Sequence, residues 1–210
     1  QLFLRRDPEA EKKLISSLIG RCEREDLGGN IYYYEGKNGM AQFRGTGEFE
    51  ILLNLDGITR EREPEAVVKL ALKKLGLDAS FQPALSGEDD LLFLVSYEDS
   101  LIQNAQISFS FISGRQLIIT GTRPLDVKES VQSSEDYQDG VTILMRFLET
   151  VHEKGYIFSE ITSLSIEYYM SSAVSGNCTL SPRWRIQTNS GPYFFDAETG
   201  NAESVESFAA

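Results

Sequence analysis

The chain has 210 residues, of which 41% are hydrophobic and 25% charged, a composition typical of a globular protein with one large domain or two small ones. Lys and Arg number 20 and Asp and Glu number 32, so the net charge is −12 and nucleic acid is disfavoured as the main partner. One His and two Cys exclude a four-ligand zinc site of the usual Cys and His kind.

Hydrophobic periodicity predicts two helices in the first half of the chain. The first covers residues 8–23, with Asp7 as its N-cap and Pro8 in its first turn. Its apolar face is made by Leu14, Ile15, Leu18, Ile19 and Cys22. The second covers residues 64–75 and ends before Gly76, a residue that tolerates the left-handed conformation at a helix end.

A third helix is predicted over residues 135–154, with Gly155 as its stop signal. Its apolar stripe is expected to consist of Val141, Leu144, Met145, Leu148 and Val151. His152 lies near the end of this helix, where a cation suits the helix dipole, and we interpret it as a surface or capping residue.

Alternating polar and apolar residues predict strands in the rest of the chain. Residues 41–55 alternate over a long span, and Gly45 and Gly47 on its apolar side indicate a bend, a bulge or a closely packed segment. Residues 30–34 precede it across a turn-rich segment, so a hairpin is expected. Further strands are predicted over residues 91–97, 106–112, 117–120, 163–169, 180–188 and 193–197.

The order helix, strand, strand, Ser-Gly turn, strand occurs twice, with the turn glycines Gly114 and Gly191 77 residues apart. Two related units would explain this order, although an ordinary α+β chain can also reuse it. We expect an α+β fold of antiparallel sheets with helices on one face. We expect residues 1–122 to form the N-terminal unit and residues 123–210 the C-terminal unit, with the division in the polar linker of residues 121–134.

Motifs for catalysis or ligand binding are scarce. The chain has no Walker-type loop, no Gly-x-Ser-x-Gly and no His-Glu-x-x-His. Acidic residues gather at Glu88–Asp90, Glu98-Asp99 and Glu135-Asp136, beside turn signals and without the spacing of a calcium loop. We interpret them as solvated turns, and we predict no catalytic residue, no metal site and no cofactor.

Two smaller features bear on partners and on redox state. Tyr32, Tyr33 and Tyr34 place neighbouring side chains on opposite faces of a strand, so at least one exposed Tyr near Arg44 would suit a protein interface. Cys22 and Cys178 could form one disulfide, but the sequence does not show that they meet, and unpaired core thiols are the more common arrangement.

The C-terminal stretch carries a family resemblance. Pro182, Trp184 and Ile186 form a Pro-x-Trp-x-Ile strand, and an aromatic strand then closes in an Asp-Ala-x-Thr-Gly turn. The second part contributes Tyr193, Asp196, Ala197, Thr199 and Gly200. This pattern resembles the end of PepSY-like domains and most closely that of the YycI proteins, over about residues 125–205. We expect Trp184 and Ile186 to face the helix predicted over residues 135–154, and Gly200 to adopt a positive φ in the turn.

The resemblance implies a fold of two PepSY-like units and a non-enzymatic role. YycI proteins are anchored by one membrane helix, and with a YycH-like relative they restrain a sensor histidine kinase from the extracytoplasmic side. A membrane anchor absent from this chain, or a cleaved signal, is therefore expected upstream of Gln1. Two alternatives stay open: a PepSY-type binding or protease-inhibitory module of the cell envelope, and a cell-wall hydrolase that uses acidic residues.

Overall fold

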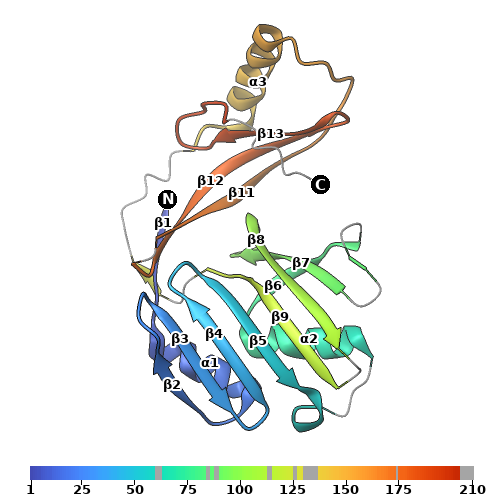
Figure 1. Cartoon of the computed structure of the whole chain (residues 1–210). Coiled ribbons are helices and arrows are strands. Elements are labelled where there is room, and N and C mark those ends of the chain that lie inside the picture. The colour runs from blue at the N-terminus through green and yellow to red at the C-terminus, as the bar shows by residue number, and fades with distance from the viewer. Residues whose placement is uncertain are drawn as a thin grey trace.

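The computed structural model describes residues 1–59, 63–83, 86–87, 90–112, 115–124, 127–129, 137–173 and 175–203 (Figure 1). Within these residues the helices are α1 (Pro8–Ile19), α2 (Pro64–Leu75), α3 (Gly140–Lys154) and the short 3-10 helix η1 (Leu55–Gly57). The strands are β1 (Leu2–Arg5), β2 (Cys22–Asp26), β3 (Ile31–Gly36), β4 (Gly39–Arg44), β5 (Glu48–Asn54), β6 (Asp78–Phe81), β7 (Asp90–Tyr97), β8 (Ser100–Ile112), β9 (Gln116–Thr122), β10 (Val127–Glu129), β11 (Ile161–Ala173), β12 (Asn177–Thr188) and β13 (Gly191–Asp196). The fold is mixed and mostly β, in agreement with the general α+β prediction.

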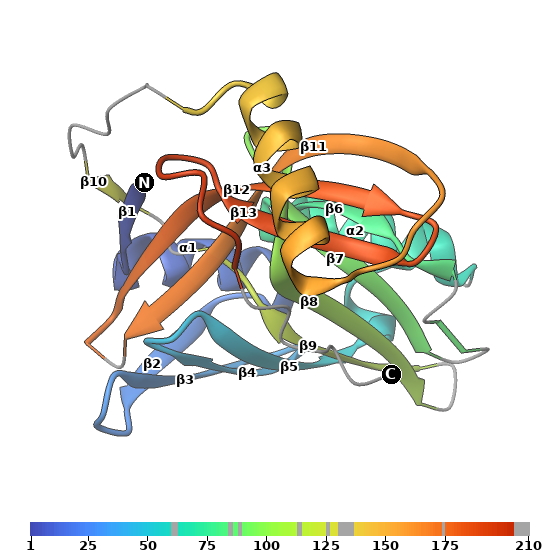
Figure 2. The same ribbon diagram turned by 90° about the horizontal axis from the view of Figure 1, so that it is seen from above.

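The strands form one large curled sheet. Its N-terminal part runs β2-β3-β4-β5-β9-β8-β7-β6, with α1 and α2 on one face (Figures 1 and 2). The long hairpin β11–β12 then joins it through a parallel contact between β11 and β8, in which Tyr168 pairs with Ile102. The other pairings of the described strands are antiparallel, as predicted. The hairpin therefore connects the two ends of the molecule.

Two hydrophobic cores lie along this sheet. The larger core packs α1 and α2 against the N-terminal strands, and it also includes Met170, Cys178 and Leu180 from the hairpin β11–β12. The smaller core lies under α3 and is centred on Ile143, Phe147, Ile186 and Phe195. Strand β12 thus contributes to both cores, and residues on either side of position 122 build the larger one together.

Helix ends agree with the prediction where local signals are strong. Helix α2 has the expected bounds, and Gly76 follows it in the left-handed conformation with φ 60°. Asp7 caps α1 by accepting hydrogen bonds from the amides of Glu9 and Ala10. The prediction that α1 reaches residue 23 is wrong, because the chain turns at Gly20 and Cys22 begins strand β2. Helix α3 begins at Gly140 because Asp139 caps it, so the predicted start is wrong for residues 137–139; residues 135 and 136 lie outside the described residues.

The span predicted as one strand over residues 41–55 is two strands, β4 and β5, joined by a turn at Gly45–Gly47. Gly47 has φ 91°, and its carbonyl accepts a hydrogen bond from the amide of Arg123. A Cβ at Gly47 would lie 2.5 Å from the Arg123 carbonyl oxygen, so the glycine is required by this close approach. The predicted hairpin of β3 and β4 is present, with Gly36 opposite Gly39.

Several strands have no counterpart in the prediction. These are β1, β2, β6 and β10, and β10 lies within the segment predicted as a linker. Strands β8, β11 and β12 are also longer than their alternation indicates. The Ser113-Gly114 turn lies outside the described residues, whereas the Ser190-Gly191 turn joins β12 to β13. Cys22 and Cys178 are both buried thiols that do not form a disulfide.

Candidate functional site

Helix α3 is held at its start by two polar contacts. The Asp139 carboxylate accepts hydrogen bonds from the amides of Val141 and Thr142, at 2.9 and 3.1 Å. Hydrogen bonding, above all from the Thr142 hydroxyl, lowers the pKa of Asp139 below its ordinary value. Next to this cap, the Trp184 indole Nε1 donates to the carbonyl of Gln138 at 2.9 Å. These contacts fix the rotation of the helix over β12 and β13.

The inner face of α3 is aromatic and closely packed. Ile143 and Phe147 are fully buried against Ile186 and Phe195. The Phe147 ring lies 5.0 Å from Tyr193 and 5.1 Å from Phe158, centroid to centroid. Such packing leaves little rotational freedom, because any turn of the helix would open a cavity beneath it.

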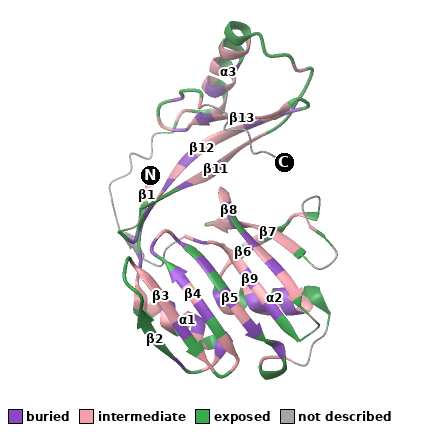
Figure 3. Cartoon of the chain, in the orientation of Figure 1, coloured by how far each residue is buried: buried purple, intermediate pink, exposed green. Residues whose placement is uncertain are grey.

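A second face of α3, next to the buried one, is exposed (Figure 3), and its residues are apolar. Val141, Met145 and Leu148 have exposed fractions of 69%, 61% and 54%, and we call these three residues the α3 face. They recur at helical spacing, so they form one stripe along the helix. The predicted buried stripe is right only for Leu144 and Val151, which pack partly buried beside the core. Its other three members form the α3 face, and Ile143 and Phe147, which the prediction left out, are the fully buried residues. Sequence reasoning missed this surface, although seven apolar residues between Val141 and Val151 exceed what one face can hold.

Charges around the α3 face are mainly acidic. Glu149 and Glu153 are exposed on the adjoining side of the helix. The Arg146 guanidinium donates instead to the carbonyl of Thr199, and Lys154 lies over the ring of Tyr156. His152 is exposed in the last turn. The surface is therefore an apolar stripe with an acidic flank.

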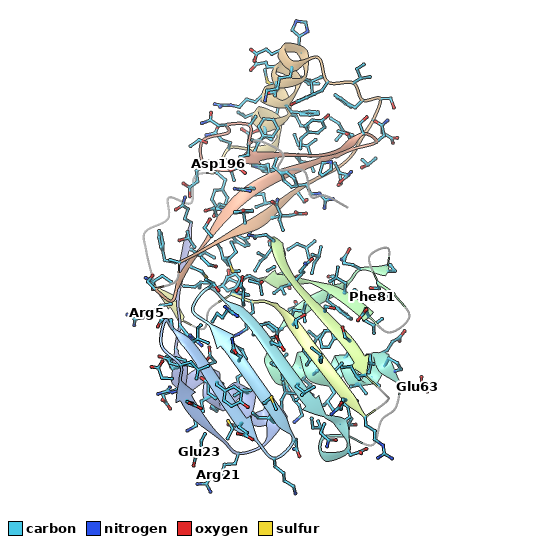
Figure 4. All side chains as sticks on the ribbon, in the orientation of Figure 1. Arg5, Arg21, Glu23, Glu63, Phe81 and Asp196 are labelled. Atoms are coloured by element: carbon cyan, nitrogen blue, oxygen red, sulfur yellow. The ribbon has the colours of Figure 1, made fainter. Side chains whose placement is uncertain are left out.

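The residues that carry the family resemblance lie on β12, on β13 and in the turn after β13, and Asp196 at the end of β13 is labelled in Figure 4. Trp184, Ile186 and Tyr193 belong to the core under α3. Pro182 and Ala197 are joined, because the amide of Ala197 donates to the carbonyl of Pro182. Asp196 accepts hydrogen bonds from the amide and hydroxyl of Thr199, and Gly200 closes the turn with φ 70°. These residues therefore build the platform that supports α3.

The Tyr cluster is divided between core and surface. Tyr34 is fully buried and donates a hydrogen bond to Glu11, so it cannot contribute to an exposed interface. Tyr32 lies under the guanidinium groups of Arg6 and Arg24. Tyr33 is partly exposed and its hydroxyl lies 3.6 Å from the Met40 sulfur, while Arg44 is exposed. An interface role for Tyr33 and Arg44 stays a prediction.

The one buried group of ionisable side chains in the described part of the chain is Glu11 with Arg6, Arg123 and Tyr34, which lies inside the larger core and away from the α3 face. No group of three or more His, Cys, Asp and Glu side chains placed to hold a metal ion occurs among the described residues. Burial is the main cause that raises the pKa values of Tyr34, Tyr168 and Glu203, which lie in separate regions. Glu98 and Asp99 form the tight turn between β7 and β8, as expected, whereas Glu88, Asp89, Glu135 and Asp136 lie outside the described residues.

Comparisons with known proteins give little further guidance. No protein-family model and no curated protein matches the chain. Among solved structures, an uncharacterized protein from Eubacterium rectale ATCC 33656 is similar at 13% identity and a TM-score of 0.46, over 95% of this chain and 81% of that one. No helix in the described residues has the length and apolar character needed to cross a membrane.

Proposed function

We propose that the chain is a non-enzymatic regulatory protein that acts through contacts with another protein. Following the resemblance of its C-terminal motif to YycI proteins, it works at the extracytoplasmic face of the cell membrane, and its partner is a sensor histidine kinase or a YycH-like protein. The observation that carries the proposal is the α3 face, since an exposed apolar stripe over a rigid platform is what a protein interface requires.

The chemistry of the partner surface follows from the flank of the α3 face. Glu149 and Glu153 adjoin the stripe, and the whole chain carries a net charge of −12. A partner segment with an apolar row and neighbouring Lys or Arg residues would complement both features. We therefore expect a basic amphipathic segment of the partner to lie along α3.

The arrangement of strands supports the relation to PepSY-like domains. Helix α2 precedes the antiparallel meander β7-β8-β9, and α3 precedes the meander β11-β12-β13. The two meanders differ in that β6 stands between α2 and β7. The same order in both halves is what two related units would give.

Site-specific photo-crosslinking tests the proposal. A photoreactive residue at Met145, in the protein expressed from its full-length gene, should crosslink to the sensor kinase or to the YycH-like protein of the same cell. Leu148→Glu should weaken binding to the purified partner by at least about tenfold, because a charge in an apolar interface is costly to desolvate.

Leu27→Glu is the matched control, since Leu27 is about as exposed as Leu148 but lies in the turn after β2. It should leave partner binding unchanged. Crosslinks to neither protein, or equal binding by the Leu148→Glu and wild-type proteins, would refute the proposed function.

A further inference from the structure

A second surface lies at the other end of the molecule, between α2 and the sheet edge. Here a groove of about 620 Å³ opens beside β6 and β7. Its apolar lining includes Val68, Leu72, Leu77, Phe81, Leu91 and Phe93. Phe81 is 46% exposed, and its ring packs against Phe93 with a centroid distance of 5.3 Å (Figure 4). An exposed aromatic ring in an apolar groove is unusual for a side chain that only fills a core.

The groove arises because two helices cannot cover this sheet. Eight neighbouring strands, from β2 to β6, span roughly 34 Å at a strand spacing of about 4.8 Å. Helices α1 and α2 lie on the same face, and each covers about 10 Å. The outer strands β6 and β7 therefore extend beyond α2, and their apolar side chains face an open channel.

The outer edge of β6 offers backbone hydrogen-bonding groups. Among the described strands β6 pairs with β7 alone, and the amide of Gln82 donates to the carbonyl of Leu92 at 2.8 Å. In an antiparallel pair, residues alternate between groups that face the partner strand and groups that face away from it. The register therefore directs the main-chain groups of Ala79 and Phe81 toward the open edge.

Two cations line the side of the groove formed by α2. Lys69 and Lys73 are exposed one helical turn apart, so their side chains can reach the same anion. Glu65 and Asp78 lie farther along the rim, one turn before Lys69 and at the start of β6. The charges of the whole lining therefore balance, and the exposed Lys69 and Lys73 pair gives one local position on α2 that favours a single carboxylate of a ligand.

We propose that this groove binds an extended acidic peptide that adds to the sheet as a strand beside β6. Its main chain pairs with Ala79 and Phe81, its alternate apolar side chains contact Phe81 and Leu72, and its carboxylate lies between Lys69 and Lys73. A strand edge can form hydrogen bonds with a peptide main chain but not with a hydrocarbon tail. The proposal is independent of the α3 face, which lies on the exposed side of the helix that covers the smaller core.

A titration with three synthetic peptides tests the proposal. The first alternates Val with Thr and ends in Asp with a free carboxylate; the second ends in Lys with an amidated terminus; the third is the first with N-methyl groups on alternate amides. Added to ¹⁵N-labelled full chain, the first should shift the amide signals of Ala79 and Phe81. The second should bind at least about tenfold more weakly and the third not at all, because N-methylation blocks strand pairing.

Variants of the chain distinguish binding in this groove from binding at the α3 face or elsewhere on the surface. The double change Lys69→Glu and Lys73→Glu should weaken the first peptide by at least about tenfold, whereas Lys13→Glu, on exposed α1, should not change its binding. Leu148→Glu should also leave binding of the first peptide unchanged. Failure of the groove proposal can therefore be distinguished from failure of the proposed α3 interface.

The proposal would be overturned by absence of saturable binding by the first peptide up to about 1 mM, by equal binding of the N-methylated peptide, or by a chain dimer in sedimentation that Phe81→Asp dissociates. The last would assign the groove to a second copy. Displacement of the first peptide by dodecanoate without any shift at Ala79 would assign it to an acyl chain instead.

Discussion

Arg6 and Glu11 form a two-pronged ion pair in the interior of the N-terminal part. The Arg6 Nε and Nη2 atoms donate to the two Glu11 carboxylate oxygens at 2.9 and 2.7 Å, and both side chains are almost fully buried. Arg123, which follows β9, lies 3.6 Å from the same carboxylate. This pair ties the segment after β1 to α1, and it therefore fixes where the N-terminal strand enters the fold.

Replacing Glu11 by Gln should reduce the free energy of unfolding by about 3–5 kcal/mol, because two buried guanidinium groups would lose their counter-charge. Urea denaturation followed by far-UV circular dichroism measures this. Glu9→Gln is the control on the same helix: Glu9 is exposed and pairs with Arg24 at 3.0 Å, so its loss should cost less than about 1 kcal/mol. Equal losses in both variants would contradict the importance of the buried pair.

The hydrogen bond from Tyr34 to the same carboxylate is sensitive to alkaline pH, because the Tyr34 hydroxyl can ionise. Its hydroxyl donates to Glu11 at 2.7 Å, and burial, followed by the hydrogen bond and charge of Glu11, raises its pKa above the ordinary value of 10. The contribution of the Tyr34 hydrogen bond to the free energy of unfolding is therefore complete below about pH 10. It is lost as the pH rises from there toward the pKa of Tyr34 in the folded state.

Tyr34→Phe should cost about 2 kcal/mol at neutral pH, since a buried charged acceptor loses one donor. Its unfolding free energy should also fall less steeply above pH 10 than that of the wild-type protein. Urea midpoints measured in parallel from pH 8 to about pH 11 check both statements. Parallel pH curves for the two proteins would show that Tyr34 does not carry the alkaline response.

Gly47 and Gly155 both have positive φ, at 91° and 67°, but their surroundings differ. A Cβ at Gly155 meets nothing within 4 Å, whereas one at Gly47 would lie 2.5 Å from the Arg123 carbonyl oxygen. Gly155→Ala should therefore cost about 1–2 kcal/mol for the left-handed backbone alone. Gly47→Ala should cost distinctly more in the same urea experiment, because the β4–β5 turn must separate from Arg123. Similar costs would mean that the turn yields easily.

Local signals predicted the elements that depend on local chemistry. Helix α2 has Pro64, a single apolar stripe and Gly76, and its bounds agree with the prediction. Strand β2 carries Glu23, Arg24 and Glu25 and therefore shows no alternation of polar and apolar residues. It forms at the edge of the sheet, where it pairs with β3. Strand β6 has only four residues, too few for an alternating pattern to be recognised, so the groove beside it was not predictable.

The face that α3 buries depends on distant residues. Apolar side chains occupy most of its circumference, so the sequence offers two candidate inner faces. Packing against Ile186 and Phe195, about 40 or more residues away along the chain, selects Ile143 and Phe147. The α3 face consists of the apolar residues that this packing leaves exposed. The sequence pattern therefore identified them as apolar but assigned them to the core.

Two neighbouring substitutions test this assignment directly. Phe147→Ala should lower the free energy of unfolding by about 3–5 kcal/mol, because it opens a cavity among the rings of Phe158 and Tyr193. Leu148→Ala should change it by no more than about 0.5 kcal/mol, since that side chain already faces solvent. Trp184, the single Trp of the chain, lies in the same core, so its fluorescence during urea unfolding reports on this part of the fold. A larger loss for Leu148→Ala than for Phe147→Ala would show that α3 is rotated and that Val141, Met145 and Leu148 are buried in solution.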